Sequence, residues 1–145
     1  MKKKTIYLAG PIAGLKKAEA WEWRIKATEK LKRYYKVINP LDKEPVVKKY
    51  VAWPRTHKRI FTLDMARVRR SDIILANFDG WRTQSVGTLI EIGLALGLGK
   101  EIYIVIHPTA RCYHPFVVHS GSVFHVLGDA LEFLVHKAGR SSYEK

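Results

Sequence analysis

The sequence has 145 residues, 47% of them hydrophobic and 27% charged, and its 26 Lys and Arg against 13 Asp and Glu give a formal net charge of +13. A chain of this length and hydrophobic content suits one domain with a sizeable core, so we expect a single domain spanning residues 1–145. The lone Cys112 excludes an intramolecular disulfide, and no apolar run reaches the ~20 residues that a membrane span needs. These features predict a cytoplasmic protein with no membrane partner.

The excess of positive charge favours an anionic partner, either a nucleotide or a nucleic acid. The basic residues are spread along the chain instead of forming one tail. No helix-turn-helix, zinc-ligand or RNA-binding aromatic pattern accompanies them. A small anionic molecule is therefore the favoured partner, and a nucleic acid the disfavoured one.

The first part of the chain predicts two strands, a helix and a loop. Thr5–Ala9 is an apolar run that ends at Gly10-Pro11, which indicates a buried strand followed by a loop. A helix is expected from 18 to 35 and a strand at 35–39. Residues 41–57 contain two prolines and no sustained period, so we expect a loop that could act as a lid. The core-facing stripe of the helix is predicted to be Trp21, Ile25, Thr28, Leu31 and Tyr35.

The rest of the chain continues the alternation of helices and strands. Thr62 is placed to cap a helix that ends near Arg70. Further strands are expected at residues 72–77, 101–106 and 123–126, helices at residues 87–98 and 129–138, and a loop at residues 78–86. This alternation predicts an α/β fold in which a parallel sheet is covered on both faces and ligands bind at the carboxyl ends of the strands.

Residues 85–93, Ser-Val-Gly-Thr-Leu-Ile-Glu-Ile-Gly, open a helix directly after a predicted strand. The first-turn amides of such a helix can hold an anion. Glu91 has two interpretations. Thr88 and Glu91 match a capping box, in which the glutamate satisfies the helix's own amide. Alternatively, the helix dipole keeps Glu91 ionised beside a pocket, ready to attack an anomeric carbon. The spacing does not choose between them.

Four blocks of sequence together resemble the nucleoside 2-deoxyribosyltransferase family and its relatives that hydrolyse nucleoside 5′-monophosphates. The blocks are Tyr7-Leu-Ala-Gly-Pro11, Trp21-x-x-Arg24, Asp64 followed by Ser71-Asp72-Ile-Ile-Leu-Ala, and Ser85-Val-Gly-Thr-x-x-Glu91-Ile-Gly93. They lie in the family's order and cover nearly the whole chain. The resemblance implies a flavodoxin-like doubly wound parallel sheet of about five strands.

The resemblance also implies catalytic roles for three residues and no cofactor. Glu91 would attack C1′ of the sugar, and the glycosyl-enzyme would pass to water or to a second base. Asp64 would protonate the departing base, and Tyr7 would hydrogen-bond Glu91 and crowd the 2′ position, favouring 2′-deoxyribose. Each has an ordinary alternative, because Asp64 lies near an expected helix start and Tyr7 on a strand belongs in a core.

The expected substrate-binding residues are Gly10, Ile12, Ser85, Gly87 and Ser122. Transferases of the family typically carry an aspartate six residues before the nucleophile, whereas the monophosphate hydrolases resemble this chain in having a serine there. A carboxylate at that point would repel a phosphate, while a hydroxyl and neighbouring amides can donate to it.

Ser122 resembles the serine that a neighbouring subunit lends to the phosphate site in those hydrolases. The resemblance therefore implies a homodimer or higher homo-oligomer. The deoxynucleotide hydrolase has serine and arginine where this chain has Pro11 and Ala13, which removes two expected phosphate contacts.

Three hypotheses follow. The first is an N-glycosidase acting on a (2′-deoxy)nucleoside 5′-monophosphate, and the second is a 2-deoxyribosyltransferase that exchanges bases between nucleosides. The third is a non-catalytic nucleotide- or nucleic-acid-binding module, against which Tyr7, Asp64 and Glu91 argue. No metal site is expected, because the separations of 7, 5 and 6 residues match no standard ligand spacing among His107, His114, His119 and His125.

Overall fold

Helices and strands alternate through the computed structural model, which describes residues 2–12, 15–41, 54–78 and 85–141. Within those residues, each strand is followed by a helix except that β2 and α2 are separated by residues that lie outside the description. The strands are β1 (Thr5–Ala9), β2 (Lys36–Ile38), β3 (Ile73–Asn77), β4 (Glu101–Val105) and β5 (Ser122–Phe124). The helices are α1 (Lys17–Leu31), α2 (Pro54–Arg70), α3 (Val86–Gly97), α4 (Pro115–Val118) and α5 (Leu127–Ser141).

The five strands form one parallel sheet in the order β2-β1-β3-β4-β5. This is the flavodoxin-like order, and it confirms the predicted fold class. The direction of winding reverses between β1 and β3, and in folds with this strand order ligands commonly bind beyond the carboxyl ends of the strands at such a point. All residues of β3 are buried, as expected for a central strand covered on both faces.

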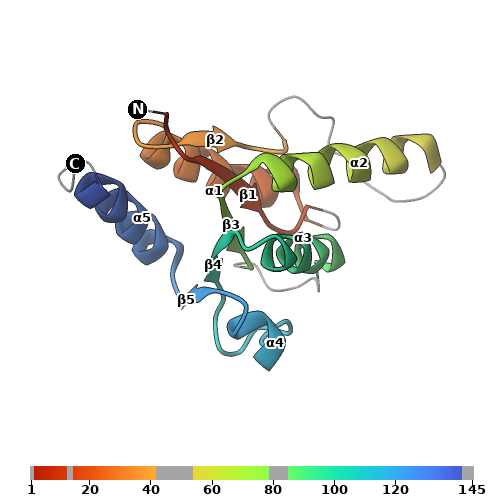
Figure 1. Cartoon of the computed structure of the whole chain (residues 1–145). Helices are drawn as coiled ribbons and strands as arrows, with labels where there is room; N and C mark the ends of the chain where they lie inside the picture. Colours follow the sequence, from red (N-terminus) through yellow and green to blue (C-terminus); the bar gives the residue numbers. More distant parts are fainter. Residues whose placement is uncertain (1, 13–14, 42–53, 79–84, 142–145) are drawn as a thin grey trace.

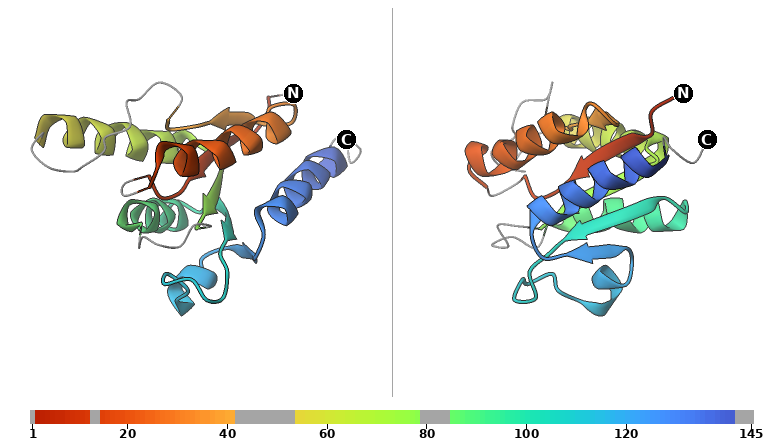
Figure 2. Two further views of the ribbon diagram at one scale, coloured as in Figure 1. Left: turned by 180° about the vertical axis from the view of Figure 1, so that it is seen from behind. Right: turned by 90° about the vertical axis from the view of Figure 1, so that its left-hand side faces the viewer.

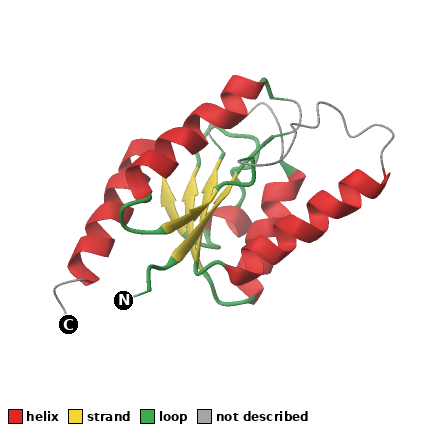
Figure 3. Ribbon diagram, turned by 90° about the horizontal axis from the view of Figure 1, so that it is seen from above, coloured by secondary structure: helices red, strands yellow, loops and turns green. Residues whose placement is uncertain are grey.

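Two helix layers cover the sheet (Figures 1 and 3). Side chains alternate along a strand, so Ile6 and Leu8 pack with α1 and α5 whereas Tyr7 and Ala9 face α2 and α3. The α2/α3 layer also includes Val117 of α4. Tyr7 is therefore directed at the two helices that carry Asp64 and Glu91.

Helix α2 begins at Pro54, eight residues before the predicted start. Thr62 is not its cap but lies inside it, where Oγ1 donates to the carbonyl oxygen of Lys58 at 2.8 Å. Proline is favoured in the first turn of a helix, and Pro54 begins α2 although the residues that follow it show no sustained apolar period. The first turns of α2 project past the sheet (Figure 1; Figure 2, left). Residues 42–53 of the predicted loop lie outside the described residues.

Helix α1 buries a different stripe from the one predicted. Ile25 is 50% exposed and Trp21 is only partly buried, whereas Ala20, Arg24, Ala27 and Leu31 are all fully buried. Leu31 is buried as predicted, whereas Tyr35 is buried but lies beyond α1, which ends at Leu31 and not at residue 35. The large apolar side chains suggested one face of the helix, but small residues allow the neighbouring face to approach the sheet closely.

Helix α4 was not predicted. Its N-cap is His114, whose ring Nδ1 accepts from the amide of Phe116 at 3.2 Å, and Pro115 is its first residue. No helix within the described residues is long and apolar enough to span a membrane. The described residues also contain no group of three or more His, Cys, Asp or Glu side chains arranged to hold a metal ion.

Candidate active site

Tyr7 lies at the centre of a buried polar cluster at the carboxyl edge of the sheet. Its side chain is 1% exposed, and its hydroxyl forms a hydrogen bond with the carboxyl of Glu91. Burial raises the pKa of Tyr7 well above its ordinary value, and the charges of Glu91 and Asp64 raise it further. Tyr7 therefore remains a phenol that can donate to an anion.

Glu91 is not part of a capping box. The N-cap of α3 is Ser85, so Thr88 is the third helical residue and Glu91 the sixth, one turn beyond the amides that a cap serves. The capping interpretation is therefore wrong. Position six also lies beyond the first turn, where most of the dipole's effect on a carboxylate is felt.

Burial raises the pKa of Glu91 to about 8, and the charge of Asp64 raises it as well, while the Tyr7 hydrogen bond and the cation of Arg24 oppose the shift. The side chain is 9% exposed. Its Oε2 is buried and has no hydrogen-bond partner among the described residues. Burial therefore disfavours the ionised form of Glu91, which opposes the expectation that the helix dipole keeps this carboxyl ionised.

Asp64 enters the cluster from α2. Its side chain is 14% exposed, and its Oδ1 accepts from Nη1 of Arg67 at 2.8 Å. Because α2 begins at Pro54, Asp64 is its eleventh residue. Its carboxylate therefore lies too far along the helix to be stabilised by the dipole at the helix start. Its charge reaches Tyr7 and Glu91, whose pKa values it raises.

Arg24 is the member of the cluster to which the sequence analysis gave no role. It is fully buried on α1, with Nη1 donating to the carbonyl oxygen of Ala20 at 2.7 Å and Nη2 to that of Gly10 at 2.9 Å. Burial lowers the pKa of Arg24 to about 10. Its position in the stripe of Ala20, Ala27 and Leu31 was the signal that could have identified it.

Two of the expected substrate-binding residues follow β1. Gly10 is packed so closely that a Cβ would lie 2.8 Å from Cζ2 of Trp23 and 2.9 Å from the carbonyl oxygen of Asn77. The position therefore requires glycine. Ile12 is partly buried, and its carbonyl oxygen accepts from the amide of Leu15 at 3.3 Å.

Ser85 and Gly87 lie at the start of α3. Ser85 has φ 35° and ψ 64°, and among the described residues no other non-glycine residue has a positive φ. Its hydroxyl is hydrogen-bonded to that of the buried Thr88. A left-handed serine is strained by about 1–3 kcal/mol, and such strain is often found at functional sites. Gly87 is exposed, and a Cβ there would meet no atom within 4 Å.

Ser122 is not brought to this cluster within one chain. It is exposed at the start of β5, and β3 and β4 lie between β5 and β1. Three strand spacings amount to roughly 14 Å. Gly121 precedes it, where a Cβ would lie 2.8 Å from Cγ2 of Ile102, so glycine lets β5 pair closely with β4.

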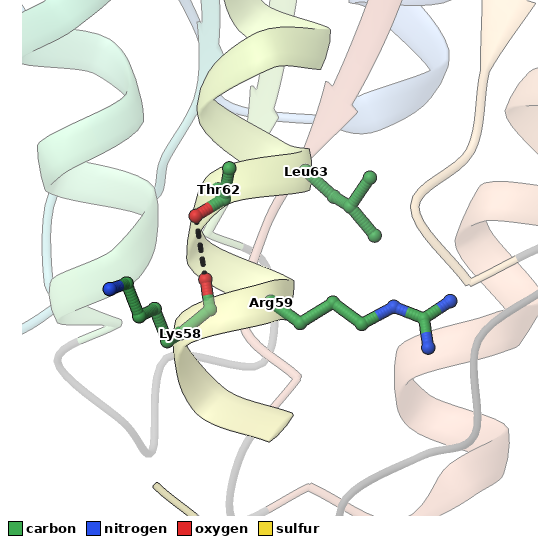
Figure 4. Close-up of a pocket in the computed structure, with 4 residues that line it drawn as sticks. All are labelled: Lys58, Arg59, Thr62 and Leu63. Atoms are coloured by element: carbon green, nitrogen blue, oxygen red, sulfur yellow. Dashed lines mark hydrogen bonds between the residues drawn. The ribbon is translucent and has the colours of Figure 1, made fainter. Parts of the chain in front are cut away.

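An open pocket of about 360 Å³ lies on the projecting half of α2, and one of its lining residues, Leu63, directly precedes Asp64. Figure 4 shows Lys58 and Thr62 on one side of the helix and Arg59 and Leu63 on the other. All four lining residues belong to one helix, and two of them, Lys58 and Arg59, are cations.

Solved structures with the same fold include a conserved protein from Enterococcus faecalis V583, with a TM-score of 0.71 and 19% identity over 93% of this chain and 99% of that one. A 2-deoxyribosyltransferase from Bacillus psychrosaccharolyticus gives 0.67 and 22% over 88% and 90%. A CMP N-glycosidase from Clostridium botulinum gives 0.57 and 18% over 90% and 98%. At these identities the likeness establishes the fold alone.

A comparison with curated proteins found no match. The sequence profile described as "Nucleoside 2-deoxyribosyltransferase", however, matches residues 6–139, which include all four blocks of the sequence pattern. The chain therefore belongs to the nucleoside 2-deoxyribosyltransferase family.

Proposed function

We propose that the protein cleaves the N-glycosidic bond of a (2′-deoxy)nucleoside 5′-monophosphate through a covalent glycosyl-enzyme on Glu91, releasing free base and sugar phosphate. The observation that carries this proposal is the buried cluster in which β1, α2 and α3 contribute Tyr7, Asp64 and Glu91. A cluster of desolvated, mutually perturbed ionisable groups at a switch-point crevice is typical of a catalytic site.

The first step forms a bond between a carboxylate oxygen of Glu91 and C1′ while the bond from C1′ to the base nitrogen breaks. The proton of Asp64 goes to the departing base. Water then attacks C1′, returns one proton to Asp64 and releases Glu91 as a carboxylate. Two displacements retain the configuration at C1′.

This mechanism needs the two carboxyl groups to hold one proton between them. Burial and the charge of Asp64 raise the pKa of Glu91 to about 8, which supports retention of a single proton by the pair at neutral pH. The reactive arrangement has that proton on Asp64 and the negative charge on Glu91. The phenol of Tyr7 would stabilise that charge by its hydrogen bond to Glu91. The family resemblance adds the expectation that the Tyr7 ring crowds a 2′-hydroxyl.

Several groups support an anionic substrate. The strained Ser85 and the first amides of α3 can donate to a phosphate, and Lys58 and Arg59 add positive charge on α2. Ser122 would come from a neighbouring subunit, because three strand spacings separate it from Tyr7 in its own chain.

The test is to incubate the protein with matched nucleosides and 5′-monophosphates of ribose and 2′-deoxyribose, with and without a second free base, and to identify the products by chromatography. We expect a 2′-deoxynucleoside 5′-monophosphate to react fastest and to give free base. Transfer of the sugar from a nucleoside to the added base would instead establish the second candidate, base exchange, which the missing phosphate contacts at Pro11 and Ala13 favour.

The Ser85→Asp variant should reverse the preference between monophosphate and nucleoside. One carboxylate within about 4 Å of a phosphate is unfavourable by roughly 4 kcal/mol at an effective dielectric near 20, whereas it gains a hydrogen bond from a 5′-hydroxyl. Ser141→Asp is the matched control, because this exposed serine at the end of α5 receives the same charge. Equal loss in both variants would attribute the effect to net charge and contradict a phosphate site at Ser85.

The shared subunit site can be tested by mixing two impaired variants. In a mixed oligomer of Ser122→Ala and Glu91→Gln, one site combines an intact Glu91 with an intact Ser122 from its neighbour. We expect the mixture to be more active than the sum of the separate variants, and sedimentation to show at least a dimer. An active monomer would contradict the sharing of Ser122.

A further inference from the structure

The guanidinium of Arg24 is a fully buried cation that makes no ion pair with a carboxylate among the described residues. Two of its N–H groups reach carbonyl oxygens, while its Nε is buried without a hydrogen-bond partner in the described part of the chain. Such burial is unfavourable, and an apolar side chain of similar volume would usually give a more stable protein. Stability alone therefore does not explain why an arginine occupies this position.

The contacts of Arg24 lead directly to the turn that follows β1. Nη2 donates to the carbonyl oxygen of Gly10 at 2.9 Å, and the guanidinium carbon lies 4.6 Å from the centroid of the Trp23 ring. Trp23 and the Asn77 carbonyl also limit the space at Gly10 to that of a hydrogen atom. The arginine thus holds the chain at the point where it leaves the sheet beside Tyr7.

The charge of Arg24 acts on the three polar groups of the cluster, each from a different element. Tyr7 of β1, Asp64 of α2 and Glu91 of α3 all interact electrostatically with the guanidinium. Arg67 also faces this group of residues, but its Nη1 is committed to Asp64 at 2.8 Å. Arg24 is therefore the cation that can compensate Glu91.

We propose that Arg24 is a positioning residue of the site: it clamps the Gly10 carbonyl at 2.9 Å and supplies a fixed positive charge within electrostatic reach of Glu91, the counter-charge that the carboxylate needs when it attacks C1′. The inference rests on the proposed function for its catalytic consequence. Its electrostatic part is independent of any turnover, because removal of the cation must raise the pKa of the Glu91 carboxyl, which Arg24 lowers.

Three variants separate the clamp from the charge. Arg24→Met keeps the length of the side chain and removes both. Arg24→Lys keeps the charge but loses the fork that reaches two carbonyl groups. Lys26→Met is the matched control, because Lys26 lies exposed on the same helix and its substitution removes the same charge.

The direct measurement is the titration of Glu91 by NMR in protein labelled with ¹³C at the glutamate carboxyls, with the signal assigned by its absence from Glu91→Gln. Arg24→Met should move the midpoint upwards by about one pH unit, and Arg24→Lys and Lys26→Met should leave it in place. A midpoint in folded Arg24→Met that matches the wild type would overturn the counter-charge. If Arg24→Met does not fold, an upward shift of the same size in Arg24→Lys would overturn it.

The kinetic measurement uses the substrate identified above. Arg24→Lys should lower kcat by about tenfold with an unchanged pH profile, because the Gly10 turn is loosened while the charge remains. Wild-type kcat in Arg24→Lys would overturn the clamp. If the wild-type protein cleaves no N-glycoside, the proposed function fails while the titration of Glu91 still decides the role of the charge.

Discussion

Two glutamates at opposite edges of the sheet show how environment assigns different roles to one side chain. Glu101 begins β4 at the amino edge, where its carboxylate accepts from Lys4 at 2.7 Å, Lys137 at 2.5 Å and Tyr103 at 2.8 Å. Burial alone would raise the pKa of Glu101, but the hydrogen bonds from Lys137, Lys4 and Tyr103 lower it to about 2. Burial raises the pKa of Glu91 to about 8, because the Tyr7 hydrogen bond and the Arg24 cation do not offset its desolvation.

The comparison separates stability from function. The three donors make the ionised form of Glu101 more favourable in the folded protein than in the unfolded chain, so Glu101 stabilises the fold. The ionised form of Glu91 is less favourable in the folded protein than in the unfolded chain. A buried group with such a shifted pKa is a candidate catalytic residue. Each glutamate can be tested by the neutral isostere glutamine, which removes the charge and keeps the shape.

The largest expected effect is on catalysis. Glu91→Gln should lower kcat by at least about a thousandfold, since an amide cannot form the glycosyl-enzyme. Turnover is measured by release of free base, and circular dichroism verifies the fold. Glu101→Gln should keep wild-type turnover. Near-normal rates in Glu91→Gln would contradict Glu91 as the nucleophile. An equal loss of activity in both variants would show that the loss comes from impaired folding and not from catalysis.

The second effect is on stability as a function of pH. The folded pKa of Glu91 is raised, so between pH ~4.5 and ~8 the folded state keeps a proton that the unfolded chain releases, and this makes the protein less stable as the pH rises. Glu91→Gln should lack that decline and exceed the wild-type free energy of unfolding at pH 8 by on the order of 2–4 kcal/mol. Urea unfolding at pH 4.5 and 8 measures the difference. Parallel pH curves for the two proteins would mean that Glu91 is ionised in the folded state.

The amount that sequence could predict differs between these regions for physical reasons. The buried strands are apolar runs, so the positions of β1, β3 and β4 followed from local pattern. Arg24 belongs to the Trp21-x-x-Arg24 block but was given no role, because Ala20 and Ala27 carry the buried stripe of α1 while the larger Trp21 and Ile25 suggested the neighbouring face. The state of Glu91 depends on contacts between β1, α2 and α3, which no local pattern records.

The smallest expected effect is on the stability contributed by Glu101, the glutamate with three hydrogen-bond donors. Its folded pKa is lowered, so its contribution to stability is present above the unfolded value near 4.5 and is lost as the pH falls towards about 2. The side chain is 34% exposed, so solvent screening limits this contribution, and Glu101→Gln should lower the free energy of unfolding at pH 7 by about 1 kcal/mol. Urea unfolding at pH 7 and pH 3 measures the change, which should shrink at pH 3.

Lys4→Met is the control: Lys4 is 56% exposed, so loss of its hydrogen bond to Glu101 should change the free energy of unfolding by less than about 0.5 kcal/mol. A loss in Lys4→Met as large as in Glu101→Gln would show that the outer lysine, and not the inner network with Lys137 and Tyr103, holds the carboxylate. The contrast between the two glutamates would then rest on a single surface pair.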